Sequence, residues 1–287
     1  MISSSCALVL QGGGTRGIFV AGVTDAFHDA GLDFPYVIGT SAGCLVGYNV
    51  VSGDRGRAKR VIIEGMQGKN FGSYSNFVHK GEYFDFRYLF NELSEIIPFN
   101  YEAYRAPGHI FYCGCTGVND GLAHYFEKSA PNFDDCATAS SSLPFVAKPV
   151  QLEDGLYMDG GTVCPIPFRK PLEDGVEKLV IVFTRTRDYR KSEEIKGAKK
   201  MAYKLKYGKY PKYLEALLNG NRFYNKEMDD MFELEKQGKA FLIFPREPLS
   251  VGRMEKDIEK LEAGYQEGLE VGKESIKALK AFLGIEE

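Results

Sequence analysis

The apolar residues of the chain gather in short runs that alternate with longer segments of helical spacing. The runs at 6–10 and 36–40 are predominantly apolar, as in strands that are covered on both faces. Each is followed by a segment, at 17–30 and 42–52, whose apolar residues recur at helical spacing. A β-α-β-α start of this kind predicts an α/β protein with a central, mostly parallel sheet and helices on both faces.

Further strands and one long helix are expected in the rest of the chain. The strand-like runs lie at 109–115, 122–126, 146–152, 156–158, 178–184 and 240–244, and the charged segment 256–283 has the pattern of a helix. The turns Asn119-Asp120-Gly121 and Glu153-Asp154-Gly155 predict hairpins. The aromatic-rich segment 71–101 fits neither period. No repeat or low-complexity linker divides the chain, so we expect a single domain over 1–287.

Composition and charge exclude several classes of protein. The chain has 287 residues, of which 44% are hydrophobic and 26% charged, with a net charge of −3. This balance provides no overall positive field, so we expect no nucleic-acid partner. The first residues lack a basic segment followed by an apolar core, and no run approaches the roughly 20 apolar residues of a membrane-spanning helix. We therefore expect a cytoplasmic protein, and the sequence does not indicate its oligomeric state.

The six cysteines do not suggest a metal or disulfide framework. They lie in apolar or glycine-rich stretches, which is typical of buried, reduced thiols. Cys113 and Cys115 are separated by one residue rather than two, and no second cluster of cysteine or histidine follows them. We interpret them as alternate positions of a strand and assign no metal and no cofactor.

A serine on a sharp turn is the strongest chemical signal. Ser41 stands in Gly39-Thr40-Ser41-Ala42-Gly43, directly after the second strand-like run and before a helical segment. Glycines on both sides allow the strained bend that lifts a serine hydroxyl clear of a sheet. The pattern predicts a nucleophile elbow, in which Gly39, Thr40, Ala42 and Gly43 surround the nucleophile of a hydrolase.

A glycine-rich loop between the first strand and the first helix is the second signal. It consists of Gly12, Gly13, Gly14, Thr15, Arg16 and Gly17. Its backbone N–H groups, at the positive end of the following helix, suit an anion. The anion is either a phosphate, since the loop satisfies G-x-G-x-x-G, or the oxyanion of a tetrahedral acyl intermediate.

The second strand distinguishes these two anions. Dinucleotide binding requires an acidic residue at the end of that strand, where it binds the ribose hydroxyls. Here the strand ends in Gly39-Thr40-Ser41, and Asp33 lies before it. We therefore favour an oxyanion hole over a phosphate loop, and a tight turn without a ligand stays open as a third interpretation.

The partner of Ser41 is expected to be an aspartate. The histidines are His28, His79, His109 and His124. None lies late in the chain, where an α/β-hydrolase carries its catalytic histidine. Asp159, in Met158-Asp159-Gly160-Gly161 after a strand-like run, is the best candidate for the base. Alone it would indicate an ordinary turn, but with the serine and the glycine loop it predicts three backbone features that meet at the carboxyl ends of strands.

These motifs resemble those of the patatin-like acyl hydrolases, whose catalytic core is related to that of the cytosolic phospholipases. The similar segments are the glycine loop at 12–17, the elbow at 39–43, Asp159-Gly160-Gly161, and the A-S-x-x-x-P segment at 139–145. The resemblance covers 6–184, the motif-bearing core, and leaves 185–287 as a family-variable part packed on it. It implies a three-layer α/β/α fold.

The resemblance implies a carboxylic ester hydrolase with a serine–aspartate dyad that acts on lipid or other acyl esters. Ser41 would attack the acyl carbonyl, and Asp159 would take its proton. Backbone N–H groups near Gly13, Gly14 and Thr15 would hold the oxyanion. A free aspartate titrates near roughly 3.9, so acylation would not fall as the pH drops through the imidazole range.

Other functions stay open beside the hydrolase. One is a nucleotide-binding protein that uses Gly12 to Gly17 as a phosphate loop, and another is a lipid-binding protein with little turnover. For the side chain of Arg16 we favour an ion pair with a carboxylate over a role in the field of the loop.

Two regions carry candidate lipid contacts. The aromatic residues at 83–90 either bind acyl chains or form ordinary core. The segment 185–213 holds eleven lysines and arginines against three acidic residues, with Ile195, Ala198, Met201, Ala202 and Leu205 as an apolar stripe. Such a basic helix either rests on anionic lipid, as a peripheral membrane contact, or packs on the body of the protein.

Overall fold

The structure is a computed structural model that describes residues 2, 3, 5–65, 71–73, 75, 79 and 82–285. Its centre is an eight-stranded sheet with the strand order β5-β6-β3-β2-β1-β7-β8, and β4 pairs with β3 outside this order. The strands are β1 (Cys6–Leu10), β2 (Tyr36–Thr40), β3 (Ile110–Gly117), β4 (Ala123–Glu127), β5 (Val150–Leu152), β6 (Gly155–Asp159), β7 (Lys178–Val182) and β8 (Ala240–Ile243).

The sheet is mixed and mostly parallel, as predicted. Strands β3, β2, β1, β7 and β8 run parallel to one another. Strands β4 and β6 run antiparallel to β3, and β5 runs antiparallel to β6. Both predicted hairpins form, since β3 turns into β4 and β5 turns into β6.

The helices differ widely in length. They are α1 (Gly17–Asp29), α2 (Ala42–Val51), α3 (Arg57–Arg60), α5 (Phe86–Phe90), α6 (Glu92–Ile96), α7 (Tyr101–Arg105), α8 (Phe133–Ser140), α9 (Arg169–Glu173), α10 (Gly197–Tyr207), α11 (Pro211–Lys236) and α12 (Ile258–Leu283). Short turns of tighter or wider helix occur at Gly14–Arg16, Gly160–Thr162 and Val61–Gly65. No helix in the described part of the chain has the length and apolar character needed to cross a bilayer.

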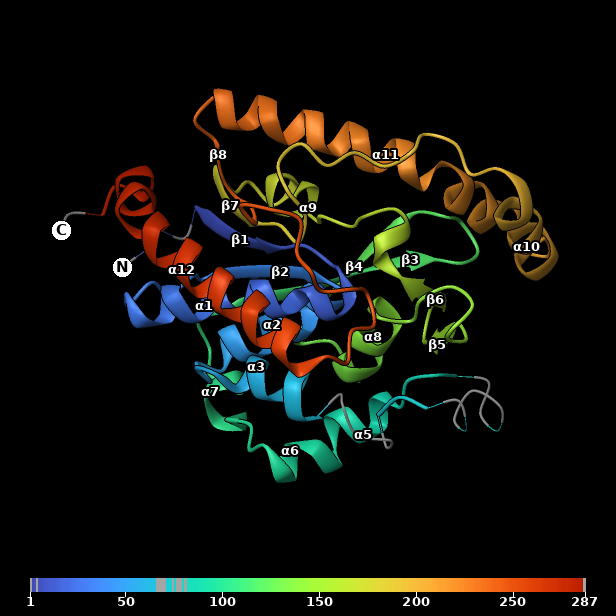
Figure 1. Cartoon of the computed structure of the whole chain (residues 1–287), viewed down its shortest axis with the longest axis horizontal. Coiled ribbons are helices and arrows are strands. Elements are labelled where there is room, and N and C mark those ends of the chain that lie inside the picture. The colour runs from blue at the N-terminus through green and yellow to red at the C-terminus, as the bar shows by residue number, and fades with distance from the viewer. Residues whose placement is uncertain are drawn as a thin grey trace.

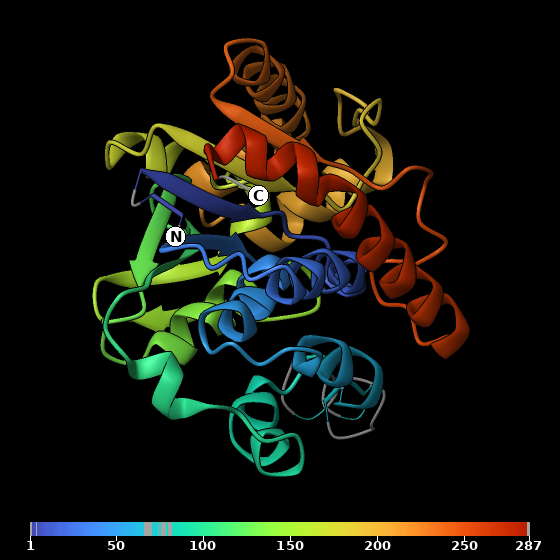
Figure 2. The same cartoon turned by 90° about the vertical axis from the view of Figure 1, so that its left-hand side faces the viewer.

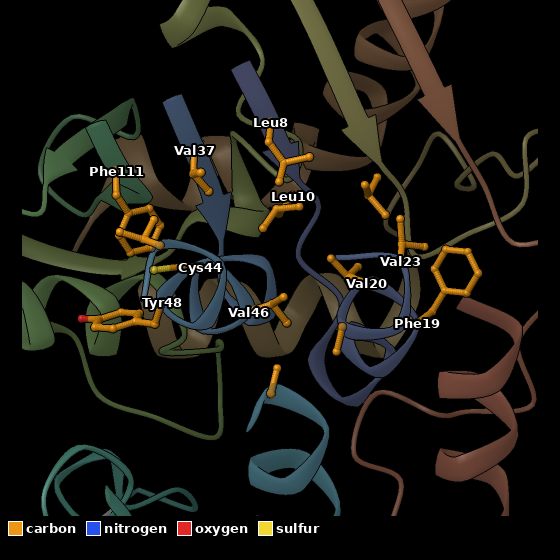
Figure 3. Close-up of a cluster of buried hydrophobic side chains, with 14 of the residues drawn as sticks. Leu8, Leu10, Phe19, Val20, Val23, Val37, Cys44, Val46, Tyr48 and Phe111 are labelled. Atoms are coloured by element: carbon orange, nitrogen blue, oxygen red, sulfur yellow. The ribbon is translucent and has the colours of Figure 1, made fainter. Parts of the chain in front are cut away.

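Helices cover both faces of the sheet, which gives the predicted three-layer α/β/α arrangement (Figure 1). In β1, Leu8 and Leu10 pack into the same cluster as Phe19 of α1, and Figure 3 shows Leu8 and Leu10 on the side of β1 that faces helices α1 and α2. The alternate residues Ala7 and Val9 belong to the cluster on the opposite face, which α11 covers. Figure 2 shows the same layers after a quarter turn. Burial on both faces explains why these strands are almost wholly apolar.

Two parts of the fold differ from the sequence-based expectation. The basic segment 185–213 does not form one helix, because only Gly197–Tyr207 is helical before Pro211 begins α11. Helix α11 itself was not expected. In the ambiguous stretch 71–101, residues 74, 76–78, 80 and 81 lie outside the described residues, and the remainder holds the short helices α5 and α6.

Candidate active site

Ser41 occupies a strained turn between β2 and α2. Its φ of 54° and ψ of −124° are rare for a residue with a side chain. A Cβ atom on Gly43 would lie 2.2 Å from the carbonyl oxygen of Leu10, so this position of the turn requires glycine. The Ser41 N–H donates to Oγ of Ser140 at 2.9 Å, and that hydroxyl donates to the Gly114 carbonyl at 2.6 Å. Backbone contacts on several sides therefore fix the predicted elbow.

The carboxyl ends of β2 and β6 meet along one edge of β3. Strand β2 ends with Thr40 opposite Gly114, and β6 runs the other way and ends with Asp159 opposite Cys115. Strand β4 pairs with the middle of β3 and overlaps there with the pairings of both β2 and β6, so it must lie along the opposite edge of β3. Strands β2 and β6 therefore share one edge of β3. Neighbouring residues of a strand are about 3.3 Å apart along its axis. The fold thus brings the segment that begins with Ser41 next to Asp159.

The carboxyl group of Asp159 is buried beside Ser41. Its side chain is 3% exposed, and Oδ1 accepts a hydrogen bond from the Gly161 N–H at 2.7 Å. Oδ2 has no partner in ordinary hydrogen-bond geometry among the described residues. Burial raises the pKa of Asp159 to about 6, against the opposing effects of the Ser41 hydroxyl, the Gly161 N–H and the more distant Arg253 and Lys191. Beside Ser41, the carboxyl group thus has one oxygen bound by the Gly161 N–H and one without a partner among the described residues.

Two N–H groups of the glycine loop have no acceptor among the described residues and could donate to a ligand. The Gly12 N–H donates to a carbonyl of the loop after β6 at 3.2 Å, and the Thr15 N–H donates to the carbonyl of Arg253 at 3.1 Å. Neither Gly13 nor Gly14 donates its N–H to an acceptor in the described part of the chain. Gly14 has a φ of 61°, and a Cβ atom on it would lie 2.2 Å from the carbonyl oxygen of Arg253, so this position also requires glycine.

Gln11 and Thr184 hold the glycine loop against the end of β7. The side-chain oxygen of Gln11 accepts from the N–H of Thr184 at 2.6 Å and from its hydroxyl at 2.9 Å. A Cβ atom on Gly12 would lie 3.2 Å from Cβ of Ser41. The loop is therefore the immediate neighbour of the serine, and Gly13 and Gly14 line the same cavity as Ser41.

Two cavities meet at Ser41. One is polar, has a volume of about 480 Å³ and is lined by the glycine loop, Asp159 and basic side chains from the segment after β7. Its size is in the range of small-molecule sites. The other is mostly apolar, and the part of its wall that the structure describes includes Leu45, Ile62, Phe71, Tyr83, Phe84 and Phe86. Of the aromatic stretch 83–90, the beginning thus lines a cavity, and Phe86 also belongs to the core cluster that contains Leu89.

The histidines and Arg16 take other places. None of the histidines lines either cavity in the described part of the chain. The ion pair expected between Arg16 and a carboxylate is not found among the described residues, and its Nε is buried without a partner at the wall of the polar cavity. Burial, with Arg185 and Arg253 nearby, lowers the pKa of Arg16 to about 10.

Sequence reasoning missed three residues that shape the site. Ser140 ties the elbow to β3, and its only signal was its place in the quoted segment 139–145. Thr184 anchors the loop through Gln11. Arg253 reaches the glycine loop from far along the chain, in a stretch with no recognisable pattern.

Comparison with known proteins places the chain in a family. The model of the patatin-like phospholipases matches residues 8–172, more than half of the chain. The chain belongs to the patatin-like phospholipase family. Membership implies acyl hydrolase activity in general terms and confirms the resemblance drawn from the motifs. A second model, described as a domain of unknown function (DUF6363), matches residues 210–284 of this patatin-like chain, over α11, β8 and α12.

Two curated proteins and one solved structure are similar. The uncharacterized protein YjjU of Escherichia coli K12 is 33% identical over 62% of this patatin-like chain and 51% of its own length. Lysophospholipase NTE1 of Scheffersomyces stipitis is 26% identical over 66% of the chain and 12% of its own length. The crystal structure of VipD from Legionella pneumophila aligns with 95% of the chain and 66% of its own, at a TM-score of 0.49 and 11% identity. The chain thus spans about half, or far less, of the curated relatives.

Proposed function

We propose that this chain is a serine acyl hydrolase that cleaves acyl esters of lipids with Ser41 as the nucleophile and Asp159 as the base. The observation that carries the proposal is the buried Asp159 carboxylate, which lies beside Ser41 with one oxygen unpartnered among the described residues. A nucleophile next to its base, with free N–H groups alongside, is the arrangement that acyl transfer requires.

The reaction follows in two steps. As the Ser41 oxygen attacks the acyl carbonyl carbon, Asp159 accepts the proton of the Ser41 hydroxyl. The N–H groups of Gly13 and Gly14 stabilise the oxyanion that forms. Asp159 then returns the proton to the departing alcohol. Water attacks the acyl-enzyme by the same route, and the acid and free Ser41 are released. Because the N–H groups of Gly12 and Thr15 already donate to backbone carbonyls, we assign the oxyanion hole to the N–H groups of Gly13 and Gly14.

The pKa of Asp159 sets the pH dependence. Because burial raises this pKa to about 6, kcat/KM should be level above pH 7 and fall about tenfold per unit below pH 6. The acid limb is thus proposed about two pH units above the value of a free aspartate, because burial disfavours the carboxylate. An acid limb near 6 does not distinguish this aspartate from a histidine, so the base must be identified by substitution.

The decisive experiment compares wild type, Ser41→Ala, Asp159→Asn and the double variant on esters of short and long acyl chains. Each single variant should lose on the order of 10³-fold or more in kcat, and the double variant should lose little more, because the two groups act as one unit. Additive losses, or full activity in either single variant, would refute the dyad. A dinucleotide that stabilises the protein while a fluorophosphonate leaves Ser41 unlabelled would favour the nucleotide-binding alternative.

We also propose that α10 brings the site to a lipid surface that carries negative charge. The helix packs on the protein through Tyr203 and Tyr207, while Met201 is 59% and Leu205 81% exposed. Lysines flank these exposed apolar side chains along α10. An apolar stripe with flanking cations is typical of helices that lie in the interface of anionic lipid.

A further inference from the structure

The polar cavity beside Ser41 has a strongly cationic wall. Six basic side chains line it, and they are Arg16, Arg185, Arg190, Lys191, Lys199 and Arg253. Asp159 is the only acidic residue among the described residues that line the cavity. The surplus of positive charge is local, because the whole chain has a net charge of −3.

Five of these six cations have no ion pair within the described part of the chain. The exception is Arg190, which pairs with Asp229 at 3.2 Å. Three of the others lie over aromatic rings, with Arg185 4.6 Å from the ring centre of Tyr189, Lys191 4.3 Å from that of Tyr224, and Lys199 5.7 Å from that of Tyr203. Rings hold the positions of the side chains and leave their charges uncompensated.

The pKa of Lys191 and the environment of Arg16 are consistent with a cluster of cations whose charges are not neutralised by nearby carboxylates. Burial, together with the nearby Arg253 and Lys199, lowers the pKa of Lys191 to about 8 against the opposing charges of Glu227 and Asp159. Arg16 has a buried Nε without a partner in the described structure. A protein gains stability when such charges are neutralised, so their retention at one wall indicates a ligand that neutralises them.

The position of Ser41 defines how an ester would lie. The serine borders both the cationic cavity and the apolar cavity, together with Gly14, Leu143 and Met254. The apolar cavity, of about 80 Å³, would hold the first part of an acyl chain whose carbonyl carbon lies at Ser41. The alcohol part of the ester would then extend into the cationic cavity.

We infer that the cationic cavity selects acyl esters whose alcohol part carries an anionic phosphate headgroup without a compensating cation. This inference rests on the proposed hydrolase function and specifies its substrate class. Arginine and lysine side chains bind phosphate oxygens through charge-assisted hydrogen bonds. A choline or ethanolamine group would bring a cation into a wall of cations, which disfavours zwitterionic headgroups.

Helix α10 supplies a matched pair of variants for the test. Lys199 lines the cavity, whereas its neighbour Lys200 faces a separate depression beside Glu193 and Glu194. Both lysines are exposed and lie in the same helix, so Lys199→Gln and Lys200→Gln make the same change of net charge. Arg185→Gln provides a second variant from the cavity wall.

The substrates are 1-octanoylglycerol 3-phosphate and the choline ester of the same phosphate, 1-octanoylglycero-3-phosphocholine, each below its critical micelle concentration. The acyl chain and the scissile bond are the same in both, and no lipid surface exists to attract the protein. The wild type should prefer the phosphate monoester by at least tenfold in kcat/KM. Lys199→Gln and Arg185→Gln should each lower that ratio at least threefold, mainly through KM, and Lys200→Gln should leave it unchanged. Free glycerol 3-phosphate should inhibit the wild type competitively and Lys199→Gln more weakly.

Two results would overturn the inference while the hydrolase proposal stands. One is Ser41-dependent hydrolysis with no preference between the two substrates, and the other is an equal loss of preference in Lys199→Gln and Lys200→Gln. Hydrolysis that persists unchanged in Ser41→Ala would instead refute the proposed function itself, and the inference with it.

Discussion

The sheet edge that carries Ser41 and the basic wall that faces it are built in different ways. At the edge, the backbone largely determines the geometry, because β2 and β6 both pair with β3 and the Ser41 N–H donates a hydrogen bond to Ser140. At the wall, long cationic side chains point into the cavity from an irregular segment after β7 and from α10. The first kind of construction fixes atoms through the backbone, and the second places charge through long side chains, three of which lie over aromatic rings. We therefore assign the chemistry to the edge and the choice of substrate to the wall.

The largest expected difference between the two regions is the loss of folding stability when a glycine is replaced by alanine. Gly43→Ala at the edge should destabilise the fold by more than about 3 kcal/mol, because its Cβ would lie 2.2 Å from the Leu10 carbonyl. Gly197→Ala, at the start of α10, has open space around it and only a positive φ of 59° to oppose it. It should cost about 1 kcal/mol. Urea unfolding followed by circular dichroism measures both, and equal costs would contradict the contrast.

The buried charge at the edge should cost stability at neutral pH. A carboxyl whose folded pKa lies above its unfolded value is destabilising wherever it is ionised, so the cost is absent below about pH 4 and complete above about pH 6. Asp159→Asn should raise stability by up to about 3 kcal/mol at pH 8 and by little at pH 4. Asp188→Asn, at an exposed position, is the control and should show no such trend. A loss of stability in Asp159→Asn at pH 8 would contradict the assignment.

The smallest expected effect concerns the exposed apolar side chains of α10, the helix that contributes Lys199 to the basic wall. Serine in place of both Met201 and Leu205 should weaken binding to vesicles of phosphatidylcholine and phosphatidylglycerol on the order of tenfold. Hydrolysis of a monomeric ester should not change. Ile258→Ser, at another exposed apolar position, is the matched control. Co-sedimentation measures the binding, and equal binding to pure phosphatidylcholine would end the proposal of an anionic lipid surface.

The sequence predicted the edge better than the wall for a physical reason. Buried strands, sharp turns and glycine positions leave local patterns, so β1, β2 and the elbow were found with the observed bounds. The antiparallel direction of β6 is a matter of pairing between distant segments. The motif therefore located Asp159 but could not show that its strand approaches Ser41 from the opposite direction.

The basic wall could not be predicted from the sequence, because its residues are far apart in the chain and only the tertiary structure brings them together. Arg16, Lys199 and Arg253 come from three distant parts of the chain and meet at one cavity. The excess of basic residues and the apolar stripe suggested a basic helix in 185–213, whereas only Gly197–Tyr207 is helical before Pro211 begins α11. The raised pKa of Asp159 could not be predicted for a related reason, because burial is not visible in a motif.

The most direct test of the central claim is the rate at which a fluorophosphonate labels Ser41, with the adduct located by mass spectrometry. We predict one adduct, on Ser41, with a rate that falls about tenfold per unit below pH 6 and that drops by orders of magnitude in Asp159→Asn. Labelling at another residue, or a rate on Ser41 that Asp159→Asn leaves unchanged, would contradict the account.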